Sequence, residues 1–165
     1  MTIYFASDHA GYDLKNELLA FVRDDLHFDV HDCGAYKSDP ADDYPAIISV
    51  AAQSVSRDVL GGIESRAIIF GASGQGEAIV ANKFRGVRAV VYYGQTGTQT
   101  DASGKVLDMI ASTRDHNNAN VLSIGAKFVP LQDAKQVVHA WLSTPFSNEE
   151  RHARRNAQID DIAHD

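Results

Sequence analysis

The chain has 165 residues and a mass of 18.0 kDa, enough for one domain with a buried core. Fifteen Lys and Arg against 22 Asp and Glu give a net charge of −7, which argues against non-specific binding to nucleic acid or an anionic membrane. The sequence contains neither an apolar run of membrane-spanning length nor the pattern of a signal peptide. The single cysteine, Cys33, excludes an internal disulfide and is read as a packing residue. We therefore expect one soluble, cytoplasmic domain over residues 1–165, with no nucleic-acid or membrane partner.

Short apolar runs of strand length alternate along the chain with longer segments of helical periodicity. Continuously apolar strands that alternate with helices are typical of a parallel sheet with helices on both faces, so the fold class is α/β. In chain order, we predict a strand at 3–6, a helix at 12–22, a weaker strand at 28–30, a helix at 45–60, a strand at 67–70, a short helix at about 76–84, strands at 87–93 and 121–124, and helices at about 131–142 and 148–162.

One segment stands out by its composition. Residues 94–104 are rich in Gly, Thr, Gln and Ser. This composition favours a surface loop, and a mobile flap beside a binding site is the alternative interpretation.

Polar residues follow the predicted strands at the edge where parallel sheets bind ligands. Asp8 and His9 follow the first strand, and a glycine-rich loop over residues 71–77 follows the third. The loop has the spacing G-x-x-G-x-G, which differs from the dinucleotide motif, and Glu77 stands where a P-loop has lysine. The loop is therefore either a backbone cradle for an anion or a tight turn required for packing.

Three further positions each allow a structural and a chemical interpretation. Glu77, in the first turn of a helix, gains from the helix dipole, but it is also placed to act as a general base. His116 is either a surface or capping residue or a catalyst. Arg151 and Arg155 share one helix face, which is either solvated or a clamp for a phosphate.

Taken together, five motifs over nearly the whole chain resemble the family of ribose-5-phosphate isomerase B and the galactose-6-phosphate isomerase subunits. The motifs are Ser7-Asp8-His9-Ala10-Gly11-Tyr12, Asp42-Asp43-Tyr44-Pro45, Gly74-Gln75-Gly76-Glu77 with Ala81-Asn82-Lys83, Asp115-His116-Asn117-Asn118-Ala119-Asn120, and Arg151-His152-x-x-Arg155.

The resemblance implies a Rossmann-like three-layer sandwich with a five-stranded parallel sheet. It also implies a homodimer or a dimer of dimers whose active sites combine residues of two subunits, with no cofactor and no metal. We expect a long polar loop before His116 that reaches across the interface. The C-terminal helix, at about 148–162, would carry the arginines that bind phosphate.

The resemblance also implies roles for individual residues. His116 matches the histidine that assists sugar-ring opening, and Asp8 matches a substrate contact at the catalytic centre. The expected ligands of the sugar and its phosphate are His9, Tyr44, Ala72, Gly74, Gln75, Gly76, Asn117, Lys127, Arg151 and Arg155.

This sequence departs from part of the family at two positions. Some members have a catalytic cysteine directly after the third strand, where this chain has Gly71, and Glu77 matches the members with a glutamate base. Lys127 stands where an arginine is frequent, which keeps the charge and loses the planar fork.

The expected reaction interconverts ribose 5-phosphate and ribulose 5-phosphate through a cis-enediolate. Glu77, with its pKa raised by partial burial, would remove the proton, and backbone N–H groups of the loop would stabilise the oxyanion. Ser73 would relay or orient a hydroxyl proton. Two alternatives are an isomerase for a six-carbon or modified sugar phosphate, such as galactose 6-phosphate or allose 6-phosphate, and a non-catalytic sugar-phosphate-binding protein.

Overall fold

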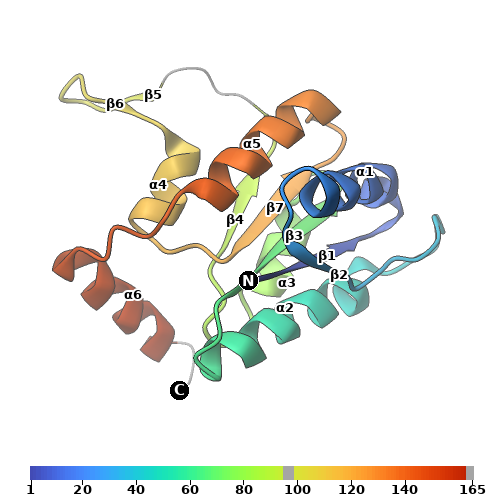
Figure 1. Ribbon diagram of the computed structural model, residues 1–165, viewed down its shortest axis with the longest axis horizontal. Helices are drawn as coiled ribbons and strands as arrows, with labels where there is room; N and C mark the ends of the chain where they lie inside the picture. Colours follow the sequence, from blue (N-terminus) through green and yellow to red (C-terminus); the bar gives the residue numbers. More distant parts are fainter. Residues whose placement is uncertain (95–98, 163–165) are drawn as a thin grey trace.

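The computed structural model describes residues 1–94 and 99–162. A parallel sheet of five strands, in the order β2-β1-β3-β7-β4, forms the middle layer, and helices cover both of its faces (Figure 1). The strands of the sheet are β1 (Thr2–Ser7), β2 (Asp29–Asp32), β3 (Ser65–Gly71), β4 (Ala89–Tyr92) and β7 (Val121–Gly125). The other elements are the 3-10 turn η1 (His9–Gly11) and the helices α1 (Tyr12–Asp24), α2 (Tyr44–Leu60), α3 (Gln75–Ala81), α4 (Met109–Asp115), α5 (Leu131–Ser143) and α6 (Glu150–Ile162).

The sheet is buried on both faces because its central strands are apolar at successive positions. In β1, Ile3 and Phe5 face the core formed with α1 and α5, while Tyr4 and Ala6 face the core formed with α2 and α3. Strand β3 is buried along its whole length. This arrangement confirms the predicted three-layer α/β fold with a five-stranded parallel sheet.

The region before β7 differs from the prediction. Residues 109–115 form the helix α4 instead of a long polar loop before His116. Asp108 caps this helix by accepting the N–H groups of Ile110 and Ala111, at 2.9 and 3.0 Å. The sequence Met-Ile-Ala-Ser-Thr-Arg-Asp is too short and too polar to show helical periodicity, which explains the error.

The described part of the glycine-rich segment at 94–104 contains one strand of a short hairpin, which the prediction of a surface loop did not include. Residues 95–98 lie outside the described residues, but β5 (Gln99–Thr100) pairs with β6 (Val106–Leu107) in an antiparallel hairpin. The Asp101 carboxylate closes the turn by accepting the N–H groups of Ser103 and Lys105, at 2.8 and 3.0 Å. Because each strand has only two residues and the turn between them is polar, the sequence shows no strand pattern here.

No helix in the described parts of the chain combines the length and the apolar character that membrane crossing requires.

A buried lysine joins α1 to the end of β2. The Lys15 side chain is 0% exposed, and its Nζ donates to Asp32 Oδ1 and Oδ2, at 2.7 and 2.8 Å, and to the Ala35 carbonyl at 2.9 Å. The lysine therefore fixes the start of the segment that leads to the active-site edge of the sheet.

We predict that Lys15→Met lowers the free energy of unfolding by about 2 kcal/mol, because the Asp32 carboxylate loses its ion-pair partner and the part-buried Ala35 carbonyl loses a donor. This value is below that of a fully buried pair, since the Asp32 side chain is 31% exposed. Urea denaturation measures the change. Lys37→Met, which breaks an exposed pair with Asp39, is the control and should leave the urea midpoint unchanged; equal midpoints for the two variants would contradict the prediction.

Candidate active site

The end of β1 places a carboxylate at the carboxyl edge of the sheet. Asp8 is buried and caps the η1 turn by accepting the Gly11 N–H at 3.1 Å. Gly11 itself packs tightly, since a Cβ at this position would lie 2.5 Å from the Phe70 Cβ on β3. The turn thus fixes Asp8 beside the end of the neighbouring strand.

The glycine-rich loop after β3 is held by the neighbouring strand β7. Gly74 adopts φ +77°, and its carbonyl accepts the Ser123 hydroxyl at 2.6 Å. The Gly71 carbonyl accepts the Ala126 N–H at 2.8 Å, and the Ala72 carbonyl accepts the Lys127 N–H at 3.2 Å. The loop is therefore a fixed turn between two strands, with its backbone presented at the carboxyl edge.

Glu77 occupies the space above the end of β3. It is 5% exposed, and a Cβ added at Gly71 would overlap its carboxylate. Burial raises the pKa of Glu77, the charge of Asp8 raises it further, and a hydrogen bond to its own backbone opposes the shift. A buried carboxyl group with a raised pKa has the property that a general base near neutral pH requires.

Tyr44 and His9 border the same edge. Tyr44, the first residue of α2, lies against the loop, because a Cβ at Gly76 would be 2.7 Å from the Tyr44 hydroxyl. His9 Nδ1 lies 2.7 Å from Asp42 Oδ1. This hydrogen bond raises the pKa of His9, the charge of Asp8 adds to the shift, and the charge of Lys127 opposes it. Lys127 therefore lies near His9, as a second cationic group at this edge.

Asp8, His9 and Asp42 are also the described residues that come closest to a metal-binding set. One ligand atom from each lies within 4.8 Å of the others. Asp8 caps η1 and His9 binds Asp42 Oδ1, whereas Asp42 Oδ2 is buried and has no hydrogen-bond partner.

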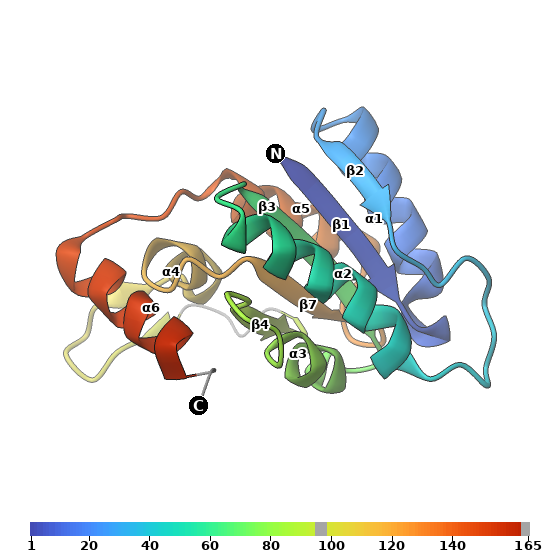
Figure 2. The same ribbon diagram turned by 90° about the horizontal axis from the view of Figure 1, so that it is seen from below.

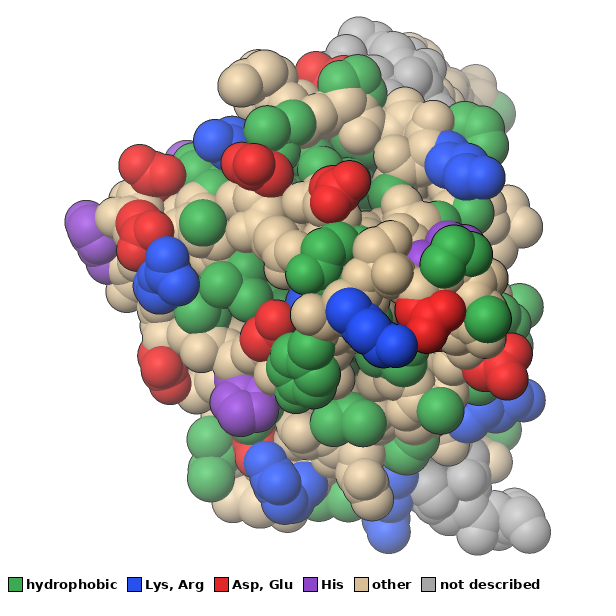
Figure 3. Space-filling view, turned by 90° about the vertical axis from the view of Figure 1, so that its right-hand side faces the viewer, with side chains coloured by type: hydrophobic (Ala, Val, Ile, Leu, Met, Phe, Trp, Pro, Cys, Tyr) green, Lys and Arg blue, Asp and Glu red, His purple; other side chains and the backbone are tan. Residues whose placement is uncertain are grey.

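Figure 3 looks onto this end of the molecule, where acidic and basic side chains are interspersed. Recognition of an anion here must therefore come from individual groups, not from a continuous basic surface.

The remaining predicted site residues form a second cluster around α4 and α6. The His116 ring lies 4.5 Å from that of His152, and its Nε2 lies 3.2 Å from Asp115 Oδ2. His152 in turn contacts the Ser147 hydroxyl through Nδ1, at 3.1 Å. Asn117, Arg151 and Arg155 are exposed beside these histidines, and Arg151 pairs with Glu149 at 3.0 Å.

This second cluster lies at the amino edge of the sheet. His116 precedes β7, whose entry is marked by the hydrogen bond from the Ala67 N–H to the Asn120 carbonyl at 2.9 Å. Arg88, just before β4, holds Asp160 of α6 at 2.8 Å. Figure 2 shows α4 and α6 beyond the start of β7, at the end of the molecule opposite to that toward which β1 points. A single chain therefore does not bring His116, Arg151 or Arg155 together with Glu77.

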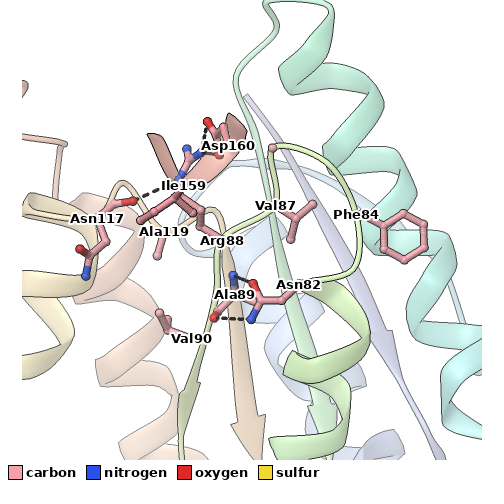
Figure 4. Close-up of a pocket in the computed structure, with 11 residues that line it drawn as sticks. Asn82, Phe84, Val87, Arg88, Ala89, Val90, Asn117, Ala119, Ile159 and Asp160 are labelled. Atoms are coloured by element: carbon pink, nitrogen blue, oxygen red, sulfur yellow. Dashed lines mark hydrogen bonds and ion pairs between the residues drawn. The ribbon is translucent and has the colours of Figure 1, made fainter. Parts of the chain in front are cut away.

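Figure 4 shows how α6 is attached at this edge. A pocket of about 340 Å³ lies between β4 and α6, with Ile159 and Asp160 on the helix and Val90 on the strand. Arg88 crosses it, binding Asp160 and the Asn117 carbonyl at 2.8 and 3.1 Å. The helix is thus tied to the segment that carries His116.

Comparison with known proteins finds relatives that match most of the chain. The family model described as Ribose/Galactose Isomerase matches residues 3–159. Ribose-5-phosphate isomerase B of Mycolicibacterium paratuberculosis is 36% identical over 155 residues, which are 94% of this chain and 87% of that protein. A crystal structure of ribose-5-phosphate isomerase B from Mycoplasma genitalium, with bound ribulose-5-phosphate, superposes with a TM-score of 0.82 at 28% identity, covering 98% and 95% of the two chains.

Another relative carries the name of a different activity. D-erythrulose-4-phosphate isomerase 2 of Mycolicibacterium smegmatis is 31% identical over 163 residues, covering 98% of this chain and 95% of its own length.

The fold and these matches define the class of protein. The chain belongs to the ribose/galactose isomerase family. It is an aldose–ketose isomerase that acts on a sugar phosphate.

Two contacts of the site have no signal in the sequence beyond the motifs that contain them. Asp42 binds His9 across 33 positions, and His152 packs on His116 although β7 and α5 lie between them in the chain. Helical or strand periodicity does not relate residues so far apart. The Asp42-Asp43-Tyr44-Pro45 motif therefore indicates the family but does not predict the contact between Asp42 and His9.

We predict that Asp42→Asn lowers the pKa of His9, because an amide oxygen stabilises an imidazolium less than a carboxylate does. The imidazolium would then be lost at a lower pH. NMR titration of the His9 Cε1–Hε1 signal measures the change. Glu17→Gln, which removes a charge from an exposed position on α1, is the control and should leave the His9 titration unchanged. An unchanged His9 titration in Asp42→Asn would contradict the assignment.

Proposed function

We propose that the protein interconverts ribose 5-phosphate and ribulose 5-phosphate through a cis-enediolate, with Glu77 as the general base. The buried carboxylate of Glu77, with its raised pKa at the ligand-binding edge of the sheet, is the observation that carries the proposal. The bound ribulose-5-phosphate in the related Mycoplasma genitalium structure and the name of the mycobacterial relative support this choice of substrate.

The reaction needs one base that works on two neighbouring carbons. In the open-chain aldose, Glu77 takes the proton from C2, and the electron pair of that bond forms the C1–C2 double bond of the enediolate. The carbonyl oxygen at C1 receives negative charge and then a proton. Loss of the proton from the C2 hydroxyl and delivery of a proton from Glu77 to C1 complete the ketose. Because the carboxylate is buried, its basicity is higher than that of an exposed glutamate.

The glycine-rich loop supplies the groups that stabilise the oxyanion. Its backbone N–H groups from Ser73 to Gly76 lie at the start of α3, where they have no acceptor within the helix. The Ser73 hydroxyl is close to the loop backbone, 3.4 Å from the Gln75 N–H nitrogen, and would orient a substrate hydroxyl. Asp8, on the other side of Glu77, would bind a sugar hydroxyl.

The complete site requires a second copy of the chain. We assign ring opening to His116 and phosphate binding to Arg151 and Arg155 of the second copy, because their own chain holds them at the opposite edge from Glu77. Strand β4 offers a surface for such a contact, since it is an edge strand of four apolar, half-buried residues. Lys127 and His9 would meet the phosphate from the Glu77 side.

Other sugar phosphates are the competing substrates. The relative from Mycolicibacterium smegmatis carries the name of a four-carbon sugar-phosphate isomerase, and the chemistry at C1 and C2 is the same for six-carbon substrates. A panel of erythrose, ribose, allose and galactose phosphates, compared by kcat/KM, decides among them. We expect the highest value for ribose 5-phosphate, measured with EDTA present, because each proposed role belongs to a side chain or backbone group.

We predict that Glu77→Gln lowers kcat by at least about 1,000-fold, with binding of ribose 5-phosphate retained, since the amide keeps the shape and cannot take a proton. Coupled kinetics and calorimetry measure the two effects. Cys33→Ser is the control: Cys33 is buried, and burial raises its pKa to about 11, so it is a neutral thiol near pH 7. A Glu77→Gln enzyme with one tenth of the normal kcat would contradict the role of the base.

Subunit mixing tests the shared site. We predict that inactive Glu77→Gln and His116→Ala proteins regain activity when they exchange subunits. Each mixed dimer should reach up to about half of the activity of a wild-type dimer, because one of its two sites then carries neither change. Mass spectrometry verifies the exchange. Complete exchange without recovered activity would place both residues in the site of one chain.

A further inference from the structure

Two adjoining pockets at the amino edge of the sheet are lined by arginines that the isomerase mechanism does not use. One pocket has a volume of about 190 Å³ and is lined by Arg66, Arg88 and Arg114. The other, of about 540 Å³, shares Arg66 and Arg114 with it and opens beside the end of α5. Because they lie where β3 begins and α4 ends, the pockets are at the opposite edge of the sheet from Glu77.

Arg66 lies between these pockets and is incompletely hydrogen-bonded. It is 5% exposed, and its Nη1 donates to the Trp141 and Leu142 carbonyls at 3.2 and 3.0 Å. Its Nη2 pairs with Glu64 at 3.0 Å, whereas its Nε is buried with no partner. Among the described residues, Glu64 is therefore the only acid that forms an ion pair with Arg66, and the Glu64 side chain is 68% exposed.

Arg114 is the second buried cation, and it has no carboxylate partner among the described residues. It is 3% exposed, and its Nη1 donates to the Asn118 side chain at 2.9 Å and to the Ala119 carbonyl at 2.5 Å. Its Nε donates to the Thr144 carbonyl at 3.3 Å. Burial and the nearby charge of Arg66 lower the pKa of Arg114 to about 10, so it is still a cation near pH 7.

The local charge of this region is positive in an acidic protein. Arg66 and Arg114 both lie over the Trp141 ring, with Cζ at 5.5 and 5.7 Å from its centroid. Carbonyl groups at the C-terminus of α5 offset part of their charge. Glu64 pairs with Arg66, and Asp160 pairs with Arg88. Neither carboxylate forms an ion pair with Arg114. Burying two positive charges side by side away from water costs free energy, and an anion bound between them offsets this cost.

We propose that these pockets form a binding site for a small phosphate-bearing anion, with the guanidinium groups of Arg66 and Arg114 as its main ligands. Guanidinium groups match the oxygens of a phosphate, and the polar Asn118 side chain, which accepts from Arg114, lines both pockets. The 190 Å³ pocket accommodates a phosphate group, and the larger pocket beside it accommodates the remainder of a phosphorylated metabolite.

The direct test is NMR titration of the arginine Nε–Hε signals with inorganic phosphate. The protein carries Arg151→Ala, Arg155→Ala, Lys127→Ala and His9→Ala, so that the side chains proposed to bind phosphate in the isomerase site are absent. Chloride at matched ionic strength controls for general salt effects, and Arg66→Lys and Arg114→Lys assign the two signals. We expect saturable shifts of both signals in the millimolar range. Shifts that are absent, or that chloride reproduces, would overturn the proposal.

A charge variant provides a second test that does not disturb a buried residue. Glu64 competes with the anion for Arg66, so Glu64→Gln should tighten phosphate binding about threefold or more. Glu17→Gln removes the same charge from an exposed position on α1 and should leave the binding constant nearly unchanged. Equal effects of the two substitutions would mean that phosphate responds only to net charge, and the site would be rejected.

Discussion

The space directly above the end of β3 holds one carboxylate and has no room for another side chain. A Cβ at Gly71 would overlap the Glu77 carboxylate, so glycine at this position is the condition for a buried glutamate. The same burial raises the pKa of Glu77 and thereby makes it a stronger base. It also accounts for the two versions of the site that the resemblance implies. A cysteine directly after this strand and a carboxylate at the position of Glu77 would occupy the same space, so one chain uses one of them.

The sheet separates the proposed machinery into two halves. Glu77, Asp8 and the glycine-rich loop lie at the carboxyl edge, where the strands deliver backbone and side chains to one place. His116 lies at the amino edge, where Arg88 and Asp160 fasten α6. A rigid parallel sheet cannot fold its two edges onto each other. The division therefore favours a second copy of the chain as the source of the missing half.

Much of the fold could be predicted from the sequence, because the strands are continuously apolar. Ala67-Ile68-Ile69-Phe70 and the helical repeat that follows Tyr12 led directly to the parallel sheet and its helices. The short polar elements could not be predicted from the sequence. The Asp108 side chain caps α4, and the Asp101 side chain closes the turn of the β5–β6 hairpin. Capping and turn contacts of this kind act over two to four residues and leave no periodic pattern.

The motifs identified the residues of the site, but they did not predict how these residues lie relative to one another in space. Glu77 was singled out by its place after a glycine-rich loop, and the structure adds the reason why it is buried, which is the missing side chain at Gly71. The contact between His9 and Asp42 and the separation of His116 from Glu77 depend on where distant segments meet. Those distances follow from the packed sheet, which a linear motif does not contain.

The most direct test of the role of Glu77 leaves Glu77 itself in place. The backbone of Gly71 lies outside the left-handed region, so alanine fits the main chain, and the three heavy atoms nearest to the new methyl group all belong to the Glu77 carboxylate. Loss of the C2 proton of ribose 5-phosphate in D₂O, followed by NMR, reports the proton transfer. Displacement of the base should slow this exchange in Gly71→Ala by about 100-fold, with the fold and sugar-phosphate binding retained. Exchange at the wild-type rate in Gly71→Ala would contradict the assignment of Glu77 as the base seated above Gly71.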